Sequence, residues 1–259
     1  MIPPTSYDVS RFRGKTALVT GASRGIGLAI AERLVADGAR VVITARHPEA
    51  LGDAVAHLGG PSVALGVAGR ADDPEHQADT VRGAIEAFGS LDLLVNNTGI
   101  NPVYGPLMDL DLGVARKVVE VNCIAAVAWT QHAFRAWMRE HGGAIVNVSS
   151  FTAIRPAPGI GFYGASKAML ASITELMAVE MAPAIRVNAV APAVVRTRFA
   201  EKLYDGREES VAGGYPLRRL GEPEDVGSLV TFLLSDDASW ITGETVMVDG
   251  GLRLSGAIE

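Results

Sequence analysis

The sequence predicts an α/β fold: a single Rossmann-type domain with a doubly wound, parallel, seven-stranded sheet and helices on both faces. Short apolar runs alternate with helix-like segments along the whole chain. Runs such as ALVT, VVIT and LLVN are almost continuously apolar, which is typical of strands buried on both faces. The first run leads through a glycine-rich turn into a helical pattern. No repeat or linker interrupts the chain, so we expect one domain over residues 1–259.

The elements follow in a regular order. After a loose polar lead-in at residues 1–13, strands are expected at 15–20, 40–44, 62–67, 91–95, 144–148, 185–190 and 244–248. Helices are expected from the glycine-rich turn to Val35 and at 47–57, 72–88, 109–139 (in one or two pieces), 161–181 and 223–234. Asp72 or Asp73 can cap the 72–88 helix, with Pro74 in its first turn. The polar segment 199–214 is expected to be a mobile lid over the substrate.

Composition limits the classes of function. The 259 residues are 48% hydrophobic and 20% charged, which is ordinary for a globular protein, and the net charge of -6 argues against nucleic acid or an anionic membrane as partner. The single cysteine, Cys123, excludes an internal disulfide and fits a reducing compartment. The first residues lack the pattern of a secretion signal, and no apolar run reaches bilayer-spanning length. We therefore expect a cytoplasmic protein without a membrane partner.

Three glycines, Gly21, Gly25 and Gly27, lie between the first strand and the first helix. Glycines there let backbone N–H groups approach a pyrophosphate at a helix N-terminus, where the helix dipole also favours an anion. Their G-x3-G-x-G spacing differs from the common G-x-G-x-x-G fingerprint, and a turn kept for tight packing is the alternative. The strand–turn–helix context favours dinucleotide binding.

Tyr163 and Lys167 stand four residues apart in the expected helix at 161–181, so they share one helical face. A nearby ammonium favours the phenolate and is expected to lower the pKa of Tyr163. A phenol tuned in this way can exchange a proton near neutral pH. An amphipathic helix with a surface lysine is the alternative interpretation.

Taken together, the motifs resemble the short-chain dehydrogenase/reductase family, including 3-oxoacyl-acyl-carrier-protein reductase-like members. The resemblance spans about residues 12–252 and is carried by Thr20-Gly21-x3-Gly25-x-Gly27, Asn96-Asn97-x-Gly99, Asn122, Ser150, Tyr163-x3-Lys167, Pro192–Thr197 and Ile241–Gly251. Chance agreement of so many motifs in this order is not a serious alternative.

The resemblance implies catalytic roles for Asn122, Ser150, Tyr163 and Lys167. Tyr163 would be the acid in carbonyl reduction and the base in alcohol oxidation. Lys167 would lower the pKa of Tyr163 and hold the nicotinamide ribose. Ser150 would hydrogen-bond the substrate oxygen, while Ser149 is the expected capping or structural serine. Asn122 would hold a water that links Lys167 to solvent; a backbone hydrogen bond is the other reason for an asparagine within a helix.

The resemblance also implies a set of cofactor-binding residues. They are Gly21, Ser23, Arg24, Gly25, Ile26, Gly27, Arg46, Asn97, Gly99, Tyr163, Lys167, Pro192, Val195 and Thr197. The second strand ends Thr44-Ala45-Arg46, without the acidic residue that selects NAD. Because Arg24 and Arg46 suit a 2′-phosphate, NADP(H) is favoured and NAD(H) is the alternative. The adenine amino group would be read by Asp72 or Asp73, or by the backbone alone.

The predicted function is NADP(H)-dependent interconversion of a carbonyl and a secondary alcohol, with thioesters, ketones and steroid-like compounds as open substrate classes. Alternatives are a catalytically silent nucleotide-sensing or scaffold protein, an isomerase or lyase on the same fold, and an NAD-dependent dehydrogenase. The substrate wall is expected at 154–162 and 199–214, with Asn101, Pro102 and Tyr104 at its mouth. The family implies a homotetramer through the long central helices and the last strand. The five histidines lack metal-ligand spacing, so no metal is expected.

Overall fold

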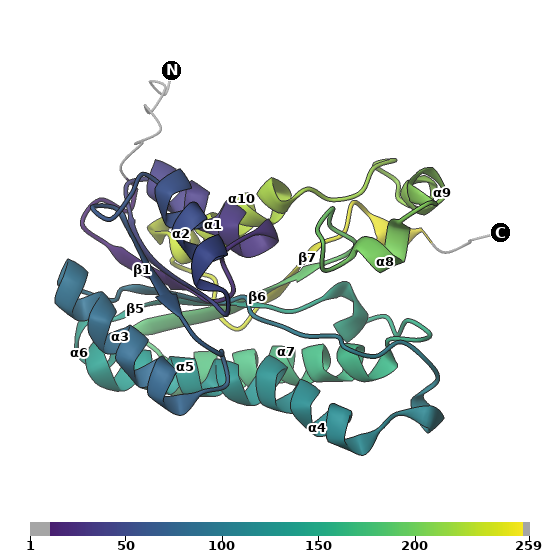
Figure 1. Ribbon diagram of the computed structural model, residues 1–259, viewed down its shortest axis with the longest axis horizontal. Helices are drawn as coiled ribbons and strands as arrows, with labels where there is room; N and C mark the ends of the chain where they lie inside the picture. The colour runs from purple at the N-terminus through teal and green to yellow at the C-terminus, as the bar shows by residue number, and fades with distance from the viewer. Residues whose placement is uncertain (1–10, 256–259) are drawn as a thin grey trace.

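Within residues 11–255, which the computed structural model describes, seven parallel strands form one sheet in the order β3-β2-β1-β4-β5-β6-β7 (Figure 1). The strands are β1 (Thr16–Val19), β2 (Arg40–Ala45), β3 (Ala64–Ala68), β4 (Leu93–Asn96), β5 (Gly143–Val148), β6 (Ile185–Pro192) and β7 (Thr245–Val248). The chain runs outward from β1 to β3 and then returns to β4 on the other side of β1. This arrangement confirms the predicted doubly wound parallel sheet, and it puts the topological switch point between β1 and β4.

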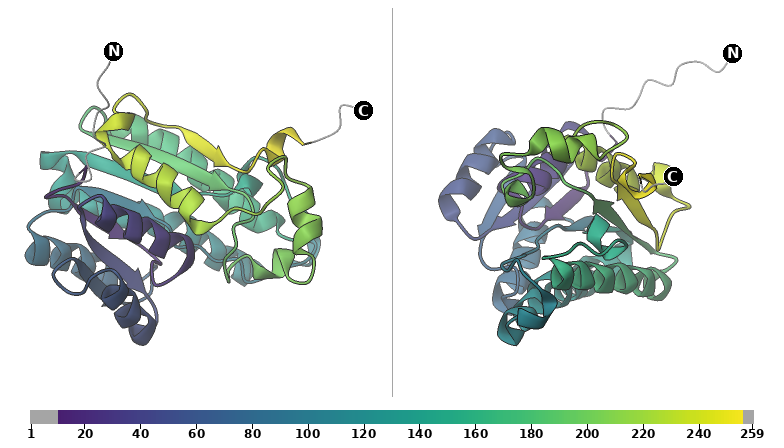
Figure 2. Two further views of the ribbon diagram at one scale, coloured as in Figure 1. Left: turned by 90° about the horizontal axis from the view of Figure 1, so that it is seen from above. Right: turned by 90° about the vertical axis from the view of Figure 1, so that its right-hand side faces the viewer.

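Helices cover both faces of the sheet (Figure 1). On one face lie α1 (Gly25–Ala36), α2 (Pro48–His57) and α10 (Pro223–Leu234). On the other lie α3 (Pro74–Phe88), α4 (Leu112–Val119), α5 (Ala125–Ala133), α6 (Arg139–His141) and α7 (Gly161–Met181). Two short helices, α8 (Glu201–Tyr204) and α9 (Glu208–Gly213), occupy the expected lid segment. Figure 2 shows them beyond the ends of the strands, beside the C-terminal segment.

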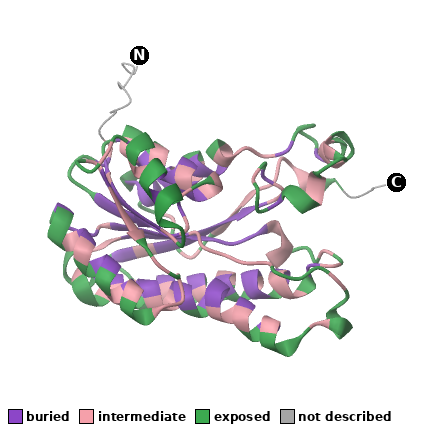
Figure 3. Cartoon of the chain, in the orientation of Figure 1, coloured by how far each residue is buried: buried purple, intermediate pink, exposed green. Residues whose placement is uncertain are grey.

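The strands β1 to β6 contribute residues to the apolar clusters on both faces of the sheet, whereas the edge strand β7 contributes to one. In β1, Ala17 and Val19 pack toward α1 and α10, whereas Leu18 packs toward α3 and α5. In β2, Val41 and Ile43 point to the first face and Val42 to the second. The buried strands between exposed outer helix faces are visible in Figure 3. Two-sided burial explains why the strand sequences are continuously apolar rather than alternating.

The expected helix at 109–139 is a run of α-helical segments joined by π-helical turns at Glu120–Ile124 and Phe134–Met138. A π turn widens the helix locally by one residue, and such bulges are frequent at functional sites. The first of these turns contains Asn122. Between the turns, Trp129 is buried, and its indole N–H donates to the carbonyl of Ala71 at 3.0 Å.

The structure refines the expectations about the lead-in before β1 and about the N-cap of α3. Phe12 is only 3% exposed, and its N–H donates to the carbonyl of Asp37 at 2.8 Å, so the lead-in is anchored there; residues 1–10 lie outside the described chain. Asp73, not Asp72, is the N-cap of α3, and its carboxylate accepts the N–H groups of Glu75 and His76.

No helix of the described chain is long and apolar enough to cross a membrane.

Candidate active site

The glycine-rich turn joins β1 to the N-terminus of α1. Gly25 begins α1 with a φ of +57°, in the left-handed region that favours glycine. A β-carbon on Gly27 would lie 2.6 Å from both the carbonyl oxygen of Gly21 and the Nδ2 of Asn97. The backbone therefore approaches itself too closely for any side chain. Ile26 packs on the core, while Ser23 and Arg24 lie in the turn itself.

Asn97 fastens the end of β4 to this turn. Its amide donates to the carbonyl oxygens of Thr20 at 2.8 Å and Gly21 at 3.0 Å. The Thr20 hydroxyl in turn accepts the N–H groups of Asn97 and Thr98 at 3.0 and 3.1 Å. The two strands at the switch point are thus locked together. Thr20 is a positioning residue that the sequence motif contained but to which no role was given.

The segment 192–197 meets the same turn from the other side. Pro192 ends β6, and Val195 forms a parallel bridge with Gly221. A β-carbon on Gly25 would lie 3.3 Å from the methyl carbon of Thr197. A helix N-terminus, a side-chain-free turn and a switch point therefore coincide, which fits the pyrophosphate of a dinucleotide.

Tyr163 and Lys167 lie on one face of α7, as their spacing predicts. Lys167 is only 2% exposed, its Nζ donates to the carbonyl of Val148 at 2.8 Å, and it lies 5.8 Å from the centroid of the Tyr163 ring. Burial lowers the pKa of Lys167 to about 8. Burial also raises the pKa of Tyr163 to about 12, and the hydrogen bond with Ser150 opposes this shift only in part.

The expected lowering of the Tyr163 pKa by the ammonium is therefore wrong for the protein by itself. Lys167 is buried and Tyr163 is partly buried, and desolvation of the phenolate is the largest cause of the shift. The consequence is that Tyr163 carries its proton throughout the physiological pH range. It is in the state required of a general acid.

The expectation about the two serines holds for Ser149 as a structural residue and is wrong for it as the cap. Ser150, rather than Ser149, is the cap: it precedes a 3-10 turn at Phe151–Ala153, and its Oγ accepts the N–H of Thr152 at 3.2 Å and the hydroxyl of Thr152 at 2.9 Å. Ser149 is buried, and its hydroxyl donates to the carbonyl of Lys167 at 2.9 Å. Because both lone pairs of Ser150 are used, its own O–H remains as a donor toward the phenol or a substrate oxygen.

Asn122 is 1% exposed and joins three segments of the site. Its amide N–H groups donate to the Ile100 carbonyl and the Ser166 hydroxyl, both at 3.0 Å, and its Oδ1 accepts the Ile100 N–H at 2.8 Å. The Asn122 side chain thus hydrogen-bonds the backbone of Ile100, which was the alternative reason for an asparagine within this helix. Gly99 lies against the Lys167 ammonium, since a β-carbon on Gly99 would be 3.1 Å from the Lys167 Nζ.

Ser166 was missed by the sequence reasoning. Its hydroxyl accepts from Asn122 and donates to the Tyr163 carbonyl at 2.7 Å. The signal was its position three residues after Tyr163, which puts it on the same helical face. It ties the π turn of the central helix to α7 at the residue that bears the phenol.

Aromatic side chains gather at the mouth of the site. The ring centroids of Tyr163 and Phe199 are 6.0 Å apart, and the Lys202 ammonium lies 5.2 Å from the Tyr104 ring centroid. A cavity of about 30 Å³ next to Tyr163 is lined by residues that include Asn101 and Pro102. The start of the 199–214 segment thus lies beside the phenol.

The adenosine side of the expected site is open. Arg24 is the N-cap of α1, Arg46 follows β2, and both are exposed. In the described chain neither guanidinium forms an ion pair, and Ala45 leaves the end of β2 without a carboxylate. Arg70 at 3.0 Å and Lys117 bind the Asp72 carboxylate, and this pairing lowers the pKa of Asp72 to about 2. Oδ1 of Asp73 caps α3, so which of Asp72, Asp73 and the backbone reads the adenine edge stays a prediction.

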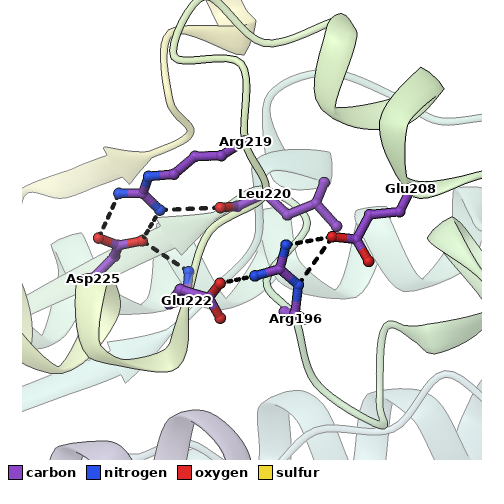
Figure 4. A network of polar contacts seen from close by, with 6 residues as sticks. All are labelled: Arg196, Glu208, Arg219, Leu220, Glu222 and Asp225. Carbon is purple, nitrogen blue, oxygen red and sulfur yellow. Dashed lines mark hydrogen bonds and ion pairs between the residues drawn. The ribbon is translucent and has the colours of Figure 1, made fainter.

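A charged network, shown in Figure 4, connects the 192–197 segment to the segment 199–214, where a lid is expected. The Arg196 guanidinium binds Glu208 of α9 and Glu222, the N-cap of α10. Arg219 donates to both oxygens of Asp225 in the first turn of α10. No sequence pattern pointed to these pairs. Among residues 11–255 no group of three or more His, Cys, Asp or Glu could hold a metal ion.

Comparison with known proteins agrees with this geometry. A family model described as enoyl-(acyl carrier protein) reductase matches residues 21–253. "Dehydrogenase/reductase SDR family member 4" of Homo sapiens is 41% identical over 244 residues, covering 92% of this chain and 87% of the relative. The protein of the same name in Caenorhabditis elegans is 39% identical over 251 residues, covering 94% and 96%. A solved short-chain glucose/ribitol dehydrogenase from Brucella melitensis superposes with a TM-score of 0.89 at 33% identity, covering 93% of this chain and 98% of that structure.

Proposed function

The chain belongs to the short-chain dehydrogenase/reductase family of oxidoreductases, which act on CH–OH or C=O groups with NAD(P), and on that premise we propose that it is an NADP(H)-dependent carbonyl reductase. The observation that carries the proposal is the convergence of a protonated Tyr163, the Ser150 hydroxyl and the buried Lys167 at the carboxyl end of the sheet. The substrate is a small carbonyl compound, with the secondary alcohol as its product.

The protein's own groups position the substrate and move the proton. The Ser150 hydroxyl oxygen already accepts two hydrogen bonds from Thr152, so Ser150 donates its O–H to the carbonyl oxygen of the substrate. Tyr163 delivers its proton to the same oxygen as the alcohol forms, and takes it back in the oxidation direction. A bound nicotinamide supplies or accepts the hydride.

Lys167 serves both partners of the reaction. One of its three N–H groups is donated to the Val148 carbonyl, and the others are available to the ribose hydroxyls of the cofactor. Its charge also stabilises the tyrosinate left after proton transfer. Asn122 holds the loop at Ile100 and, through the remaining lone pair of Oδ1, a water on the path from Lys167 to solvent.

The cofactor proposal is NADP(H) rather than NAD(H). The glycine-rich turn with Gly21, Gly25 and Gly27 would receive the pyrophosphate, while Gly99, Pro192, Val195 and Thr197 would border the ribose and nicotinamide. The exposed guanidiniums of Arg24 and Arg46 support a 2′-phosphate, because guanidiniums bind phosphate oxygens and stabilise their charge. Wild type should give a higher kcat/KM with NADPH than with NADH. Arg46→Gln should reduce that ratio, and Ala45→Asp should reverse it.

Turnover experiments separate the proposal from its alternatives. Absorbance loss of NADPH is measured with acyl thioesters, cyclic ketones and steroids, and cofactor binding is measured separately by fluorescence. We expect reduction of at least one class, and loss of turnover with retained NADPH binding in Tyr163→Phe. Binding without turnover of any carbonyl would favour a nucleotide sensor, and unchanged turnover in Tyr163→Phe would remove that residue from the proton step. Product formed without net NADPH consumption would favour an isomerase or lyase.

The assembly proposed is a homotetramer in the cytoplasm. Large apolar side chains are exposed along the central helices, including Ile124, Leu176 and Val179, which are 48, 58 and 78% exposed. Such a patch supports a protein interface. Light scattering coupled to size exclusion tests this, with a monomer as the contrary result. The free Cys123 thiol is buried, which fits a reducing compartment.

A further inference from the structure

A second, larger cavity lies close to Ser150 in the chain. It has a volume of about 330 Å³ and is lined by Phe151, Ile154, Arg155 and Arg253. Sites for small molecules have volumes of roughly 300–1,000 Å³, so this one is sufficient for a small group. Its wall combines the phenyl ring of Phe151 and the aliphatic side chain of Ile154, which is 57% exposed, with two arginines. This mixture suits a ligand that is apolar along its length and anionic at its end.

Three of the four lining residues follow Ser150 closely along the chain. Ser150 is the N-cap of the 3-10 turn that begins at Phe151, and the Arg155 N–H donates to the Phe151 carbonyl at 3.1 Å. Arg155 is therefore held one turn beyond the catalytic hydroxyl. Arg253 approaches from the short turn after β7, where its N–H donates to the Asp249 carboxylate at 2.9 Å. Only β6 separates β5 from β7, a span of about 10 Å.

Within residues 11–255, no carboxylate is paired with the arginine side chains of this cavity. In the described chain, neither Arg155 nor Arg253 has a side-chain hydrogen bond or an ion pair, whereas Arg196 and Arg219 both hold carboxylates. Asp249, the nearest carboxylate along the chain, uses its oxygens to accept the N–H groups of Gly251 and Arg253. Two guanidiniums that share a cavity favour an anion between them, and their planar donors match a carboxylate or phosphate.

We propose that Arg155 and Arg253 form a subsite for an anionic group at the far end of the carbonyl substrate. This inference rests on the proposed reductase function and specifies its substrate class: a ketone or aldehyde with a terminal carboxylate or phosphate. The carbonyl lies at Ser150 and Tyr163, the apolar part of the substrate contacts Phe151 and Ile154, and the charged end binds the arginines.

The test compares linear methyl ketones that end in a carboxylate, a phosphate or a methyl ester, with NADPH as cofactor. Wild type should have a higher kcat/KM for an anionic ketone than for the ester, and the better anion identifies the terminal group. Arg155→Gln and Arg253→Gln should each raise KM for the anionic ketone by about tenfold, with little change for the ester. Arg139→Gln, on α6 at the opposite end of β5, is the matched control and should change neither.

The outcomes distinguish this inference from the function on which it rests. If no ketone is reduced at all, the reductase proposal fails, and titration calorimetry of the anionic ketones against wild type and Arg253→Gln still tests the subsite. Equal kcat/KM for acid and ester in wild type would overturn the inference. So would a parallel loss for acid and ester in the arginine variants, because that assigns the arginines to the shape of the site rather than to charge recognition.

Discussion

Gly27→Ala should destabilise the protein although alanine is the better helix former. Gly27 lies in the first turn of α1 and is buried. Its added β-carbon would lie 2.6 Å from the Gly21 carbonyl oxygen and from the Asn97 Nδ2, and 2.9 Å from the Ala22 α-carbon. Two of these three atoms belong to the backbone, so no side-chain rotation relieves the overlap. The turn must move away from α1 or from the end of β4.

The magnitude follows from three contributions. Alanine gains about 1 kcal/mol over glycine in helix propensity. Overpacking of a close contact costs about 1–3 kcal/mol. Displacing the Asn97 amide weakens its hydrogen bonds to Thr20 and Gly21, each worth about 0.5–1.5 kcal/mol. We expect a net loss of about 1–3 kcal/mol in the free energy of unfolding, together with weaker dinucleotide binding.

Gly83→Ala is the matched control. Gly83 lies within α3, and a β-carbon there would meet no atom within 4 Å. The same substitution should therefore stabilise by about 0.5–1 kcal/mol. Urea unfolding, followed by tryptophan fluorescence at one protomer concentration, measures both, with Trp129 as a buried reporter. An unchanged urea midpoint for Gly27→Ala, or an equal loss in both variants, would refute the argument from close approach.

Two further predictions concern charged groups. The pKa of Lys167 is about 8 in the folded protein and near 10.5 in the unfolded chain, so the unfolded chain binds more protons between these pH values. The free energy of unfolding should therefore rise with pH from about pH 8, by about 3 kcal/mol up to pH 10.5. The raised pKa of Tyr163 opposes this only above pH 10, and Lys167→Met should remove the rise in urea unfolding of the protein without cofactor. Arg196→Gln should loosen the segment 199–214 and raise KM by at most about fivefold, because only its pair with Glu208 reaches that segment and an exposed ion pair is worth ~1 kcal/mol at most. Steady-state kinetics at low and high salt test this against Arg219→Gln, and an unchanged KM would contradict a latching role.

The sheet could be predicted because its signals are local. Apolar strands, glycine turns and capping residues each occupy a few consecutive positions, and the alternation of elements then leaves little freedom in topology. The segment around Tyr163 and Lys167 is local in the same sense, since one helical turn puts both on one face. What the pattern could not predict were contacts between distant segments. The carboxylate of Asp72 was a candidate for reading adenine, yet it is held by Lys117, 45 residues away.

The sign of the Tyr163 pKa shift shows the same limit in energetic form. Helical spacing indicates which groups are neighbours, but desolvation depends on what else packs against them, such as Phe199 from the segment after β6. The ammonium of Lys167 is itself desolvated, and it directs one N–H to the Val148 carbonyl. Because desolvation also disfavours the charge of Lys167, the ammonium does not lower the pKa of Tyr163 in the protein by itself. The protonated phenol beside a desolvated ammonium supports the proposed role of Tyr163 as a proton donor, in which the tyrosinate becomes favourable only once the proton has a carbonyl oxygen to go to.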